Sequence, residues 1–207
     1  HISKGEELAL ASAGMYFYWY EGGSIEESGT IGHPHHWYYY HRTISTNNLL
    51  IYNPDEEFIQ SDYSGPHNFG NDGGQRFDMP STVRYGHDCL TPGGYCDTGG
   101  LIRYEDADDY TVSTADATIA YNSVLYTEND NIAKVSKVIR DFVYLKSDDG
   151  NEDYFVIFDK IDSTDADFKK TWLLHTVGKP EFDGDYEILN GNENGGIIIS
   201  SDSELLT

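Results

Sequence analysis

The chain has little positive charge and no long hydrophobic run. Of its 207 residues, 13 are lysine or arginine and 36 are aspartate or glutamate, which gives a formal net charge of −23 at pH 7. Nucleic acids and anionic membrane surfaces repel a chain of this charge rather than recruit it. No apolar segment approaches the roughly 18 residues that a membrane-spanning helix requires. We therefore expect neither nucleic acid nor a membrane as a partner.

Cysteine is also scarce, and its two copies, Cys89 and Cys96, stand close together. Between them lies Thr91-Pro92-Gly93-Gly94, where proline followed by glycine is typical of a tight turn. A disulfide here would stabilise the chain by about 2 to 3 kcal/mol and would indicate an oxidising compartment. The alternatives are two buried thiols or a zinc site with His87, although no second ligand pair is spaced for zinc. We predict the disulfide.

Segments with helical periodicity are scarce as well. Tyrosine, phenylalanine, valine, isoleucine and threonine instead occur in short runs separated by glycine, asparagine and aspartate, which is a strand-and-turn composition. The predicted strands are Leu8–Ala13, Met15–Tyr20, His36–His41, Thr43–Tyr52, Leu101–Tyr104, Ala117–Tyr126, Ala133–Leu145, Tyr154–Ile161, Lys170–Val177, Tyr186–Leu189 and Gly196–Ser200. Their spacing predicts an all-β fold, a large antiparallel β-sandwich that forms a single domain over residues 1–207.

Two stretches depart from this pattern of short amphipathic strands. Residues 53–100 are rich in glycine, proline, asparagine and aspartate, which predicts a long irregular loop with little regular structure. The strand from Tyr154 to Phe158 is apolar at both odd and even positions, so both of its faces need a cover. Trp172-Leu173-Leu174 repeats the feature. The second cover would be the long loop, another chain or a domain outside this sequence.

Several segments of the chain resemble the β-sandwich portion of heparinase II/III-like polysaccharide lyases. They are HISKGEELALASAGMY, HHWYYYHRTISTNNLLIYNPDE, NDGGQR, VSTADATIAYN, VIRDFVYL, DYFVIFDKIDSTD and KKTWLLHTVGKPEF. The most specific pieces are His41-Arg42-Thr43-Ile44 with Asn47, and the block from Phe155 to Pro180. The resemblance implies an N-terminal α/α toroid before the antiparallel β-sandwich. Since residues 1–207 contain no toroid, we expect the chain to be a fragment of a longer one.

The resemblance also implies a function. The family cleaves uronate-containing polysaccharide by β-elimination, which needs a base, an acid and a group that neutralises the uronate carboxylate. Several of these groups come from the toroid, so we expect the isolated chain to be inactive. The expected partners are an acidic polysaccharide and a toroid domain or other copies of the chain, and the expected location is secreted or extracellular, including the periplasm or cell surface. The alternative is a non-enzymatic extracellular module that binds glycan or self-assembles.

Metal ligands depart from the family pattern. Ala11 stands where many relatives have a metal-binding aspartate, and Thr46 stands where they have a histidine, so the resemblance implies that the usual zinc site is lost. Calcium is the one candidate cofactor, because Asp148, Asp149 and Asp153 surround a glycine turn with hard oxygen ligands. The spacing is not that of an EF-hand, and the sequence favours a solvated hairpin turn instead.

The segment with the most candidate functional residues runs from His33 to His41 and combines histidines with aromatic residues. Alternation along a strand would place His36, Tyr38 and Tyr40 on one face, and Trp37 on the other. Aromatic rings stack on sugars and a histidine titrates near neutral pH. We therefore take His36 and Tyr40 as catalytic candidates, and His35, Trp37 and Tyr38 as substrate-binding candidates. The alternative is an aromatic-rich core strand with solvated histidines.

Two further substrate-binding candidates are Gln75 and Arg76. The planar guanidinium of Arg76 suits a uronate carboxylate, and Gln75 would donate or accept a hydrogen bond beside it. A structural role is the alternative for both Arg42 and Arg76. Each arginine would find a carboxylate as an ion-pair partner in so acidic a chain. We favour that structural role for Arg42 and leave Arg76 open.

Overall fold

In a computed structural model, the chain consists of two compact units. The described residues are 2–4, 7–10, 39, 42–57, 59–62, 65–68, 70–75, 92, 97–122, 130–147, 153–175, 181–183, 186–192 and 195–200. One unit spans Ile51–Lys170, and the other combines His1–Leu50 with Thr171–Thr207. The single domain predicted over residues 1–207 stays a prediction.

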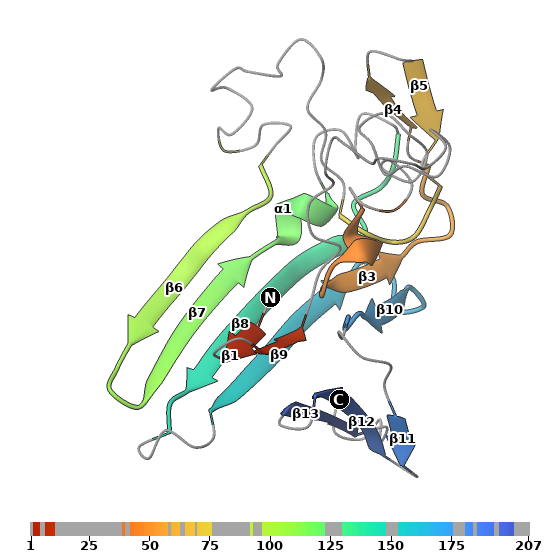
Figure 1. The fold of residues 1–207 in the computed structure, drawn as a ribbon. Coiled ribbons are helices and arrows are strands. Elements are labelled where there is room, and N and C mark those ends of the chain that lie inside the picture. The colour runs from red at the N-terminus through yellow and green to blue at the C-terminus, as the bar shows by residue number, and fades with distance from the viewer. Residues whose placement is uncertain are drawn as a thin grey trace. The chain divides into compact units, whose positions relative to one another are not determined.

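The unit of residues 51–170 is built on a four-stranded antiparallel sheet (Figure 1). Its strands follow chain order and are β6 (Gly100–Asp106), β7 (Tyr110–Asp116), β8 (Val135–Leu145) and β9 (Tyr154–Ser163). Valines define the register in the middle of the sheet, where Val112 lies opposite Val143 and Val143 opposite Val156. Such cross-strand pairs of β-branched side chains stabilise a sheet.

Charged side chains bind one another at the turn between β6 and β7. Glu105 accepts hydrogen bonds from the Tyr110 hydroxyl and from Arg103, at 2.6 Å, and both lower the pKa of Glu105. Lys146 donates to Asp106 at 2.7 Å, which lowers the pKa of that carboxyl. These contacts join the ends of β6 and β7 on either side of their turn, and they tie Lys146, which follows β8, to the end of β6.

A helical turn, α1 (Thr118–Tyr121), follows β7 in the segment that leads to β8 (Figure 1). The strand predicted over residues 117–126 is therefore wrong in its described part. Asp116 Oδ1 accepts a hydrogen bond from the Thr118 backbone N–H at 2.9 Å, and the Thr118 hydroxyl accepts one from Val138 N–H at 2.9 Å. These contacts outweigh the β-propensity of the segment, because propensity is a weak preference that tertiary contacts override.

The stretch from residue 53 to 100 contains more regular structure than its composition predicts. β4 (Ile59–Asp62) and β5 (Gly65–Asn68) form an antiparallel hairpin in which Ile59 lies opposite Asn68. The rest of its described residues, 53–57, 70–75, 92 and 97–99, have no helix or strand. The predicted long loop is thus interrupted by a hairpin.

The other unit contains two small antiparallel sheets. β1 (Ile2–Lys4) pairs with β2 (Glu7–Leu10), and β12 (Tyr186–Asn192) lies between β11 (Glu181–Asp183) and β13 (Gly195–Ser200). A short 3-10 turn covers Thr43–Ser45, where a strand was predicted. β3 (Leu49–Tyr52) and β10 (Lys169–Trp172) form a further two-stranded sheet, and each of these strands includes residues of both units.

Antiparallel strands account for most of the described structure, and helix is limited to short turns. The all-β prediction is confirmed at this level, while the β-sandwich stays a prediction. No helix among the described residues combines the length and the apolar character needed to cross a membrane.

Candidate functional site

Most of the side chains singled out from the sequence lie outside the described residues. These are His35, His36, Trp37, Tyr38, Tyr40, Arg76, Ala11, Asp148, Asp149, Cys89 and Cys96. Their roles stay predictions. Thr46, Asp153 and Gln75 are described, and each has defined partners.

Thr46 closes the 3-10 turn that precedes it. Its backbone N–H and its hydroxyl both donate to the Thr43 carbonyl, at 3.0 and 2.9 Å. The Thr46 side chain, which the resemblance predicts to replace a metal ligand, is thus used within its own turn. Among the described residues, no group of three or more histidine, cysteine, aspartate or glutamate side chains is arranged to hold a metal ion.

Asp153 closes the hairpin between β8 and β9. Its Oδ1 accepts a hydrogen bond from the Ser147 backbone N–H at 3.1 Å, just beyond the pair Leu145 and Tyr154. A hydrogen bond from the Tyr144 hydroxyl to Asp153 raises the pKa of Tyr144. These contacts agree with the hairpin turn that the sequence favoured, and the calcium candidate stays untested.

Gln75 is half-buried, and its side chain is hydrogen-bonded to Tyr121. Tyr121 ends α1 and is completely buried. Burial raises the pKa of the Tyr121 hydroxyl far above its ordinary value. A tyrosine in this state stays protonated at neutral pH and is unsuited to remove a proton from substrate. Tyr121 therefore holds Gln75 rather than serving as a base.

Lys134, which directly precedes β8, lies beside Tyr121 and the residue before Gln75. Its Nζ donates to Glu56 Oε2 and to the Gly74 carbonyl, both at 2.9 Å. The Lys134 and Glu56 side chains are fully buried. The Nζ also lies 5.6 Å from the centroid of the Tyr121 ring, within cation–π range. We call Glu56, Gly74, Gln75, Tyr121 and Lys134 the Lys134 cluster.

Asparagine side chains fix the loops that supply this cluster. The Asn71 amide donates to the Asn53 carbonyl at 2.5 Å, and Asn71 Oδ1 accepts from the Gly73 N–H at 3.2 Å. On the other side, Asn122 Oδ1 accepts from the Lys134 N–H at 3.0 Å. Asn131 exchanges two hydrogen bonds with the backbone of Glu57, at 2.9 and 2.6 Å. Amide side chains thus satisfy loop backbone groups that have no ladder partner.

Gly73 lies directly against the backbone of β3. Its φ is +79°, and its carbonyl accepts a hydrogen bond from the Ile51 N–H at 2.7 Å. A Cβ at this position would lie 2.7 Å from the carbonyl carbon of Ile51. Only glycine allows the backbone of residue 73 to approach β3 so closely.

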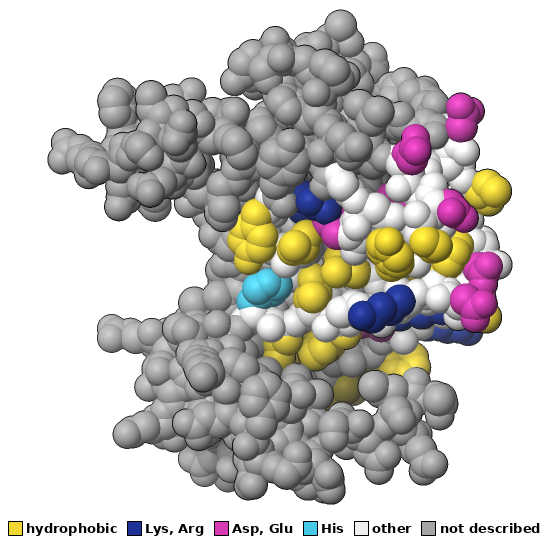
Figure 2. All heavy atoms as spheres, turned by 90° about the vertical axis from the view of Figure 1, so that its right-hand side faces the viewer, with side chains coloured by type: hydrophobic (Ala, Val, Ile, Leu, Met, Phe, Trp, Pro, Cys, Tyr) yellow, Lys and Arg dark blue, Asp and Glu magenta, His cyan; other side chains and the backbone are white. Residues whose placement is uncertain are grey.

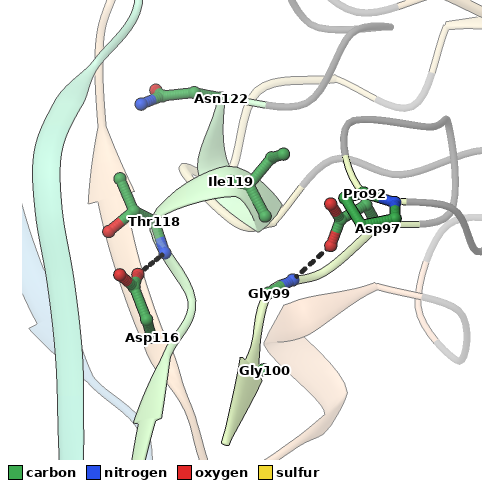
Figure 3. A pocket seen from close by; sticks show the side chains of 8 residues that line it. All are labelled: Pro92, Asp97, Gly99, Gly100, Asp116, Thr118, Ile119 and Asn122. Atoms are coloured by element: carbon green, nitrogen blue, oxygen red, sulfur yellow. Dashed lines mark hydrogen bonds between the residues drawn. The ribbon is translucent and has the colours of Figure 1, made fainter. Parts of the chain in front are cut away.

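A hollow of about 600 Å³ lies where β6 begins and α1 follows β7 (Figure 3). Its two carboxylates already accept backbone hydrogen bonds, Asp97 from Gly99 and Asp116 from Thr118, each at 2.9 Å. Pro92, Gly100, Ile119 and Asn122 complete the described lining, and none of these described residues is basic. Two carboxylates without a cation disfavour a uronate in this hollow.

The sheet exposes apolar side chains on both faces of β9. Tyr154, Phe155, Val156 and Phe158 are 57%, 41%, 47% and 62% exposed. Successive residues of a strand point to opposite faces, so Phe155 and Val156 belong to different faces. Phe155 stacks on Tyr144 across the strands, with ring centroids 4.7 Å apart. Figure 2 shows hydrophobic side chains gathered at the described surface, with acidic side chains toward one side.

His175 and Asn47 come together in the other unit. The His175 backbone N–H donates to Asn47 Oδ1, and the ring Nδ1 lies 3.3 Å from the same oxygen. Both residues lie in the most specific segments of the family resemblance, although His175 was not singled out as a candidate. The pair orients the imidazole ring of a half-buried histidine.

No protein-family model, curated protein or solved structure matches this chain.

Proposed function

We propose that the chain is the β-sandwich portion of a secreted, heparinase II/III-like polysaccharide lyase that acts on uronate-containing polysaccharide by β-elimination. In this proposal the chain supplies a binding surface, and the groups that complete the chemistry come from a toroid domain. The proposal rests on the family resemblance of the sequence, and the apolar exposure on both faces of β9 supports the docking of a further domain there. Exposed apolar patches larger than a few hundred Å² commonly mark interaction surfaces.

Part of the positive charge on the described sheet is used in ion pairs. A lyase needs a cation or hydrogen-bond donor for the uronate carboxylate. Arg103, Arg140 and Lys146 of the described sheet are instead paired with carboxylates, at 2.6, 2.7 and 2.7 Å. Arg140 holds Asp159 with two parallel hydrogen bonds. Gln75 is the described candidate that would contact substrate without adding charge.

The expected result is that the purified chain binds acidic polysaccharide but does not cleave it. The test uses alginate, ulvan and glycosaminoglycans. Ultraviolet absorbance follows the unsaturated uronate product, and affinity electrophoresis measures binding to the same polymers. Absorbance should stay flat while at least one polymer retards the chain. Clear turnover would contradict the inactivity, and the absence of retardation by every polymer would contradict glycan binding.

The alternative function is a self-assembling extracellular module, and the same apolar surface favours it. β9 is an edge strand among the described residues, since it pairs with β8 alone. Unpaired edges and apolar faces promote association between copies. In a purified sample the available occupant is a second copy of this chain. The predicted disulfide between Cys89 and Cys96 belongs to either extracellular proposal.

We expect the purified chain to self-associate in moderate salt, where its net charge is screened. Phe155→Asp and Val156→Asp place a carboxylate on opposite faces of β9, so one of them should lower the mass measured by light scattering. Ala166→Asp is the control, because it adds the same charge at an exposed position outside β9. A folded monomer at high protein concentration would show that the surface needs no second copy.

A further inference from the structure

We infer that Lys134, together with Tyr121, is a positioning residue that presents Gln75. The inference rests on the proposed function, because Gln75 is the substrate-binding candidate whose side chain is described. Lys134 and Tyr121 are fully buried, so a glycan at the surface could not reach them. Each of them is one contact away from Gln75, by a different route.

The first route is through the backbone. The Lys134 Nζ donates to the carbonyl of Gly74, the residue directly before Gln75, at 2.9 Å. The Gly74 N–H donates in turn to Asp72 Oδ1 at 2.8 Å. Both polar groups of the residue before Gln75 are therefore held, and the direction in which the chain enters Gln75 is fixed.

The second route is through the side chain. The Tyr121 hydroxyl is hydrogen-bonded to the Gln75 side chain, while the ring of Tyr121 lies beneath the Lys134 Nζ at 5.6 Å. The ammonium group thus acts on both the peptide that leads to Gln75 and the ring that holds its amide. Glu56, at 2.9 Å, balances the buried charge. Preorganising a binding side chain in this way reduces the ordering cost of binding.

A fully buried ion pair is also poor evidence for stability alone. Desolvation of both ions often cancels their attraction, so that apolar replacements of similar volume fold well. The double variant Lys134→Met with Glu56→Leu therefore removes the ammonium group without leaving an unpaired buried charge. Lys137→Met is the matched control, since Lys137 lies on β8 and makes only an exposed ion pair with Asp162, at 3.8 Å, among its described contacts.

The experiment follows the side-chain amide of Gln75 by NMR and measures the affinity for uronate oligosaccharides of the tested polymers. In the double variant the Gln75 amide signal should shift and exchange faster with solvent, and affinity should fall about five- to tenfold, as for the loss of one hydrogen bond. In a Gln75→Ala background the double variant should cause no additional loss of affinity. Lys137→Met should change neither quantity.

Tyr121→Phe provides a second variant that does not depend on the ion pair. It removes only the hydroxyl that binds Gln75, and it should produce the same change in the amide signal. An unchanged Gln75 signal in folded samples of both variants would overturn the inference and leave Lys134 a structural residue. A changed signal in a chain whose unmodified form binds no uronate oligosaccharide would support positioning and contradict the proposed function.

Discussion

Replacing Gly73 with alanine is expected to lower the free energy of unfolding by about 3 kcal/mol or more. Alanine is strained at the φ of +79° that residue 73 adopts. Its Cβ would also lie 2.7 to 2.8 Å from backbone atoms of Ile51 and Tyr52, which cannot move without lengthening the hydrogen bond from Ile51 to Gly73. Denaturant unfolding followed by circular dichroism measures the effect.

Gly70 and Gly100 are matched controls for this substitution. Gly70 has a φ of +69°, but a Cβ there would meet nothing within 4 Å, so Gly70→Ala should cost only the backbone strain of about 1 to 2 kcal/mol. Gly100 has open space and no positive φ, and alanine should be nearly neutral there. If Gly73→Ala and Gly70→Ala have equal effects, the close approach of residue 73 to β3 is incorrect.

Lys134→Met alone is expected to destabilise the unit of residues 51–170 by about 3 to 5 kcal/mol. The substitution leaves the Glu56 carboxylate fully buried without its cation, and the Gly74 carbonyl without its donor. Adding Glu56→Leu should recover most of the loss, because no unpaired charge remains. Lys137→Met, by comparison, should change stability by no more than about 0.5 kcal/mol, as expected for an exposed pair.

Thermal and denaturant unfolding of these variants can be compared directly. A single Lys134→Met variant as stable as Lys137→Met would mean that Glu56 is not buried as described. A double variant less stable than the single one would mean that the two side chains do not form a pair. Either result would remove the structural basis of the Lys134 cluster.

Strands with long apolar runs could be predicted from the sequence. Ala133–Leu145 and Tyr154–Ile161 differ from β8 and β9 by two residues at one end each. β7, by contrast, was not predicted, because Tyr110–Asp116 has a single valine among threonine, serine and alanine. Its neighbours β6 and β8 pair with it on both edges, and this context determines strand formation more than intrinsic preference does.

The candidate site could be predicted only in part. Gln75 was a candidate because it stands beside Arg76 in the NDGGQR segment, but none of its partners stood out in the sequence. Lys134 lies 78 residues from Glu56 and 60 from Gly74, and local patterns do not reveal contacts at such separations. A single lysine beside Val135 is ordinarily solvated, so its burial followed only from the three-dimensional arrangement.

These same separations bear on the order in which the unit forms. The turns that join β6 to β7 and β8 to β9 are short, so those pairs close small loops at little entropic cost. The contacts of Lys134 close loops of 60 and 78 residues and become favourable only once the strands are in place. The contacts of Lys134 would then form late in folding, after the transition state. Their loss would speed unfolding and leave the folding rate almost unchanged.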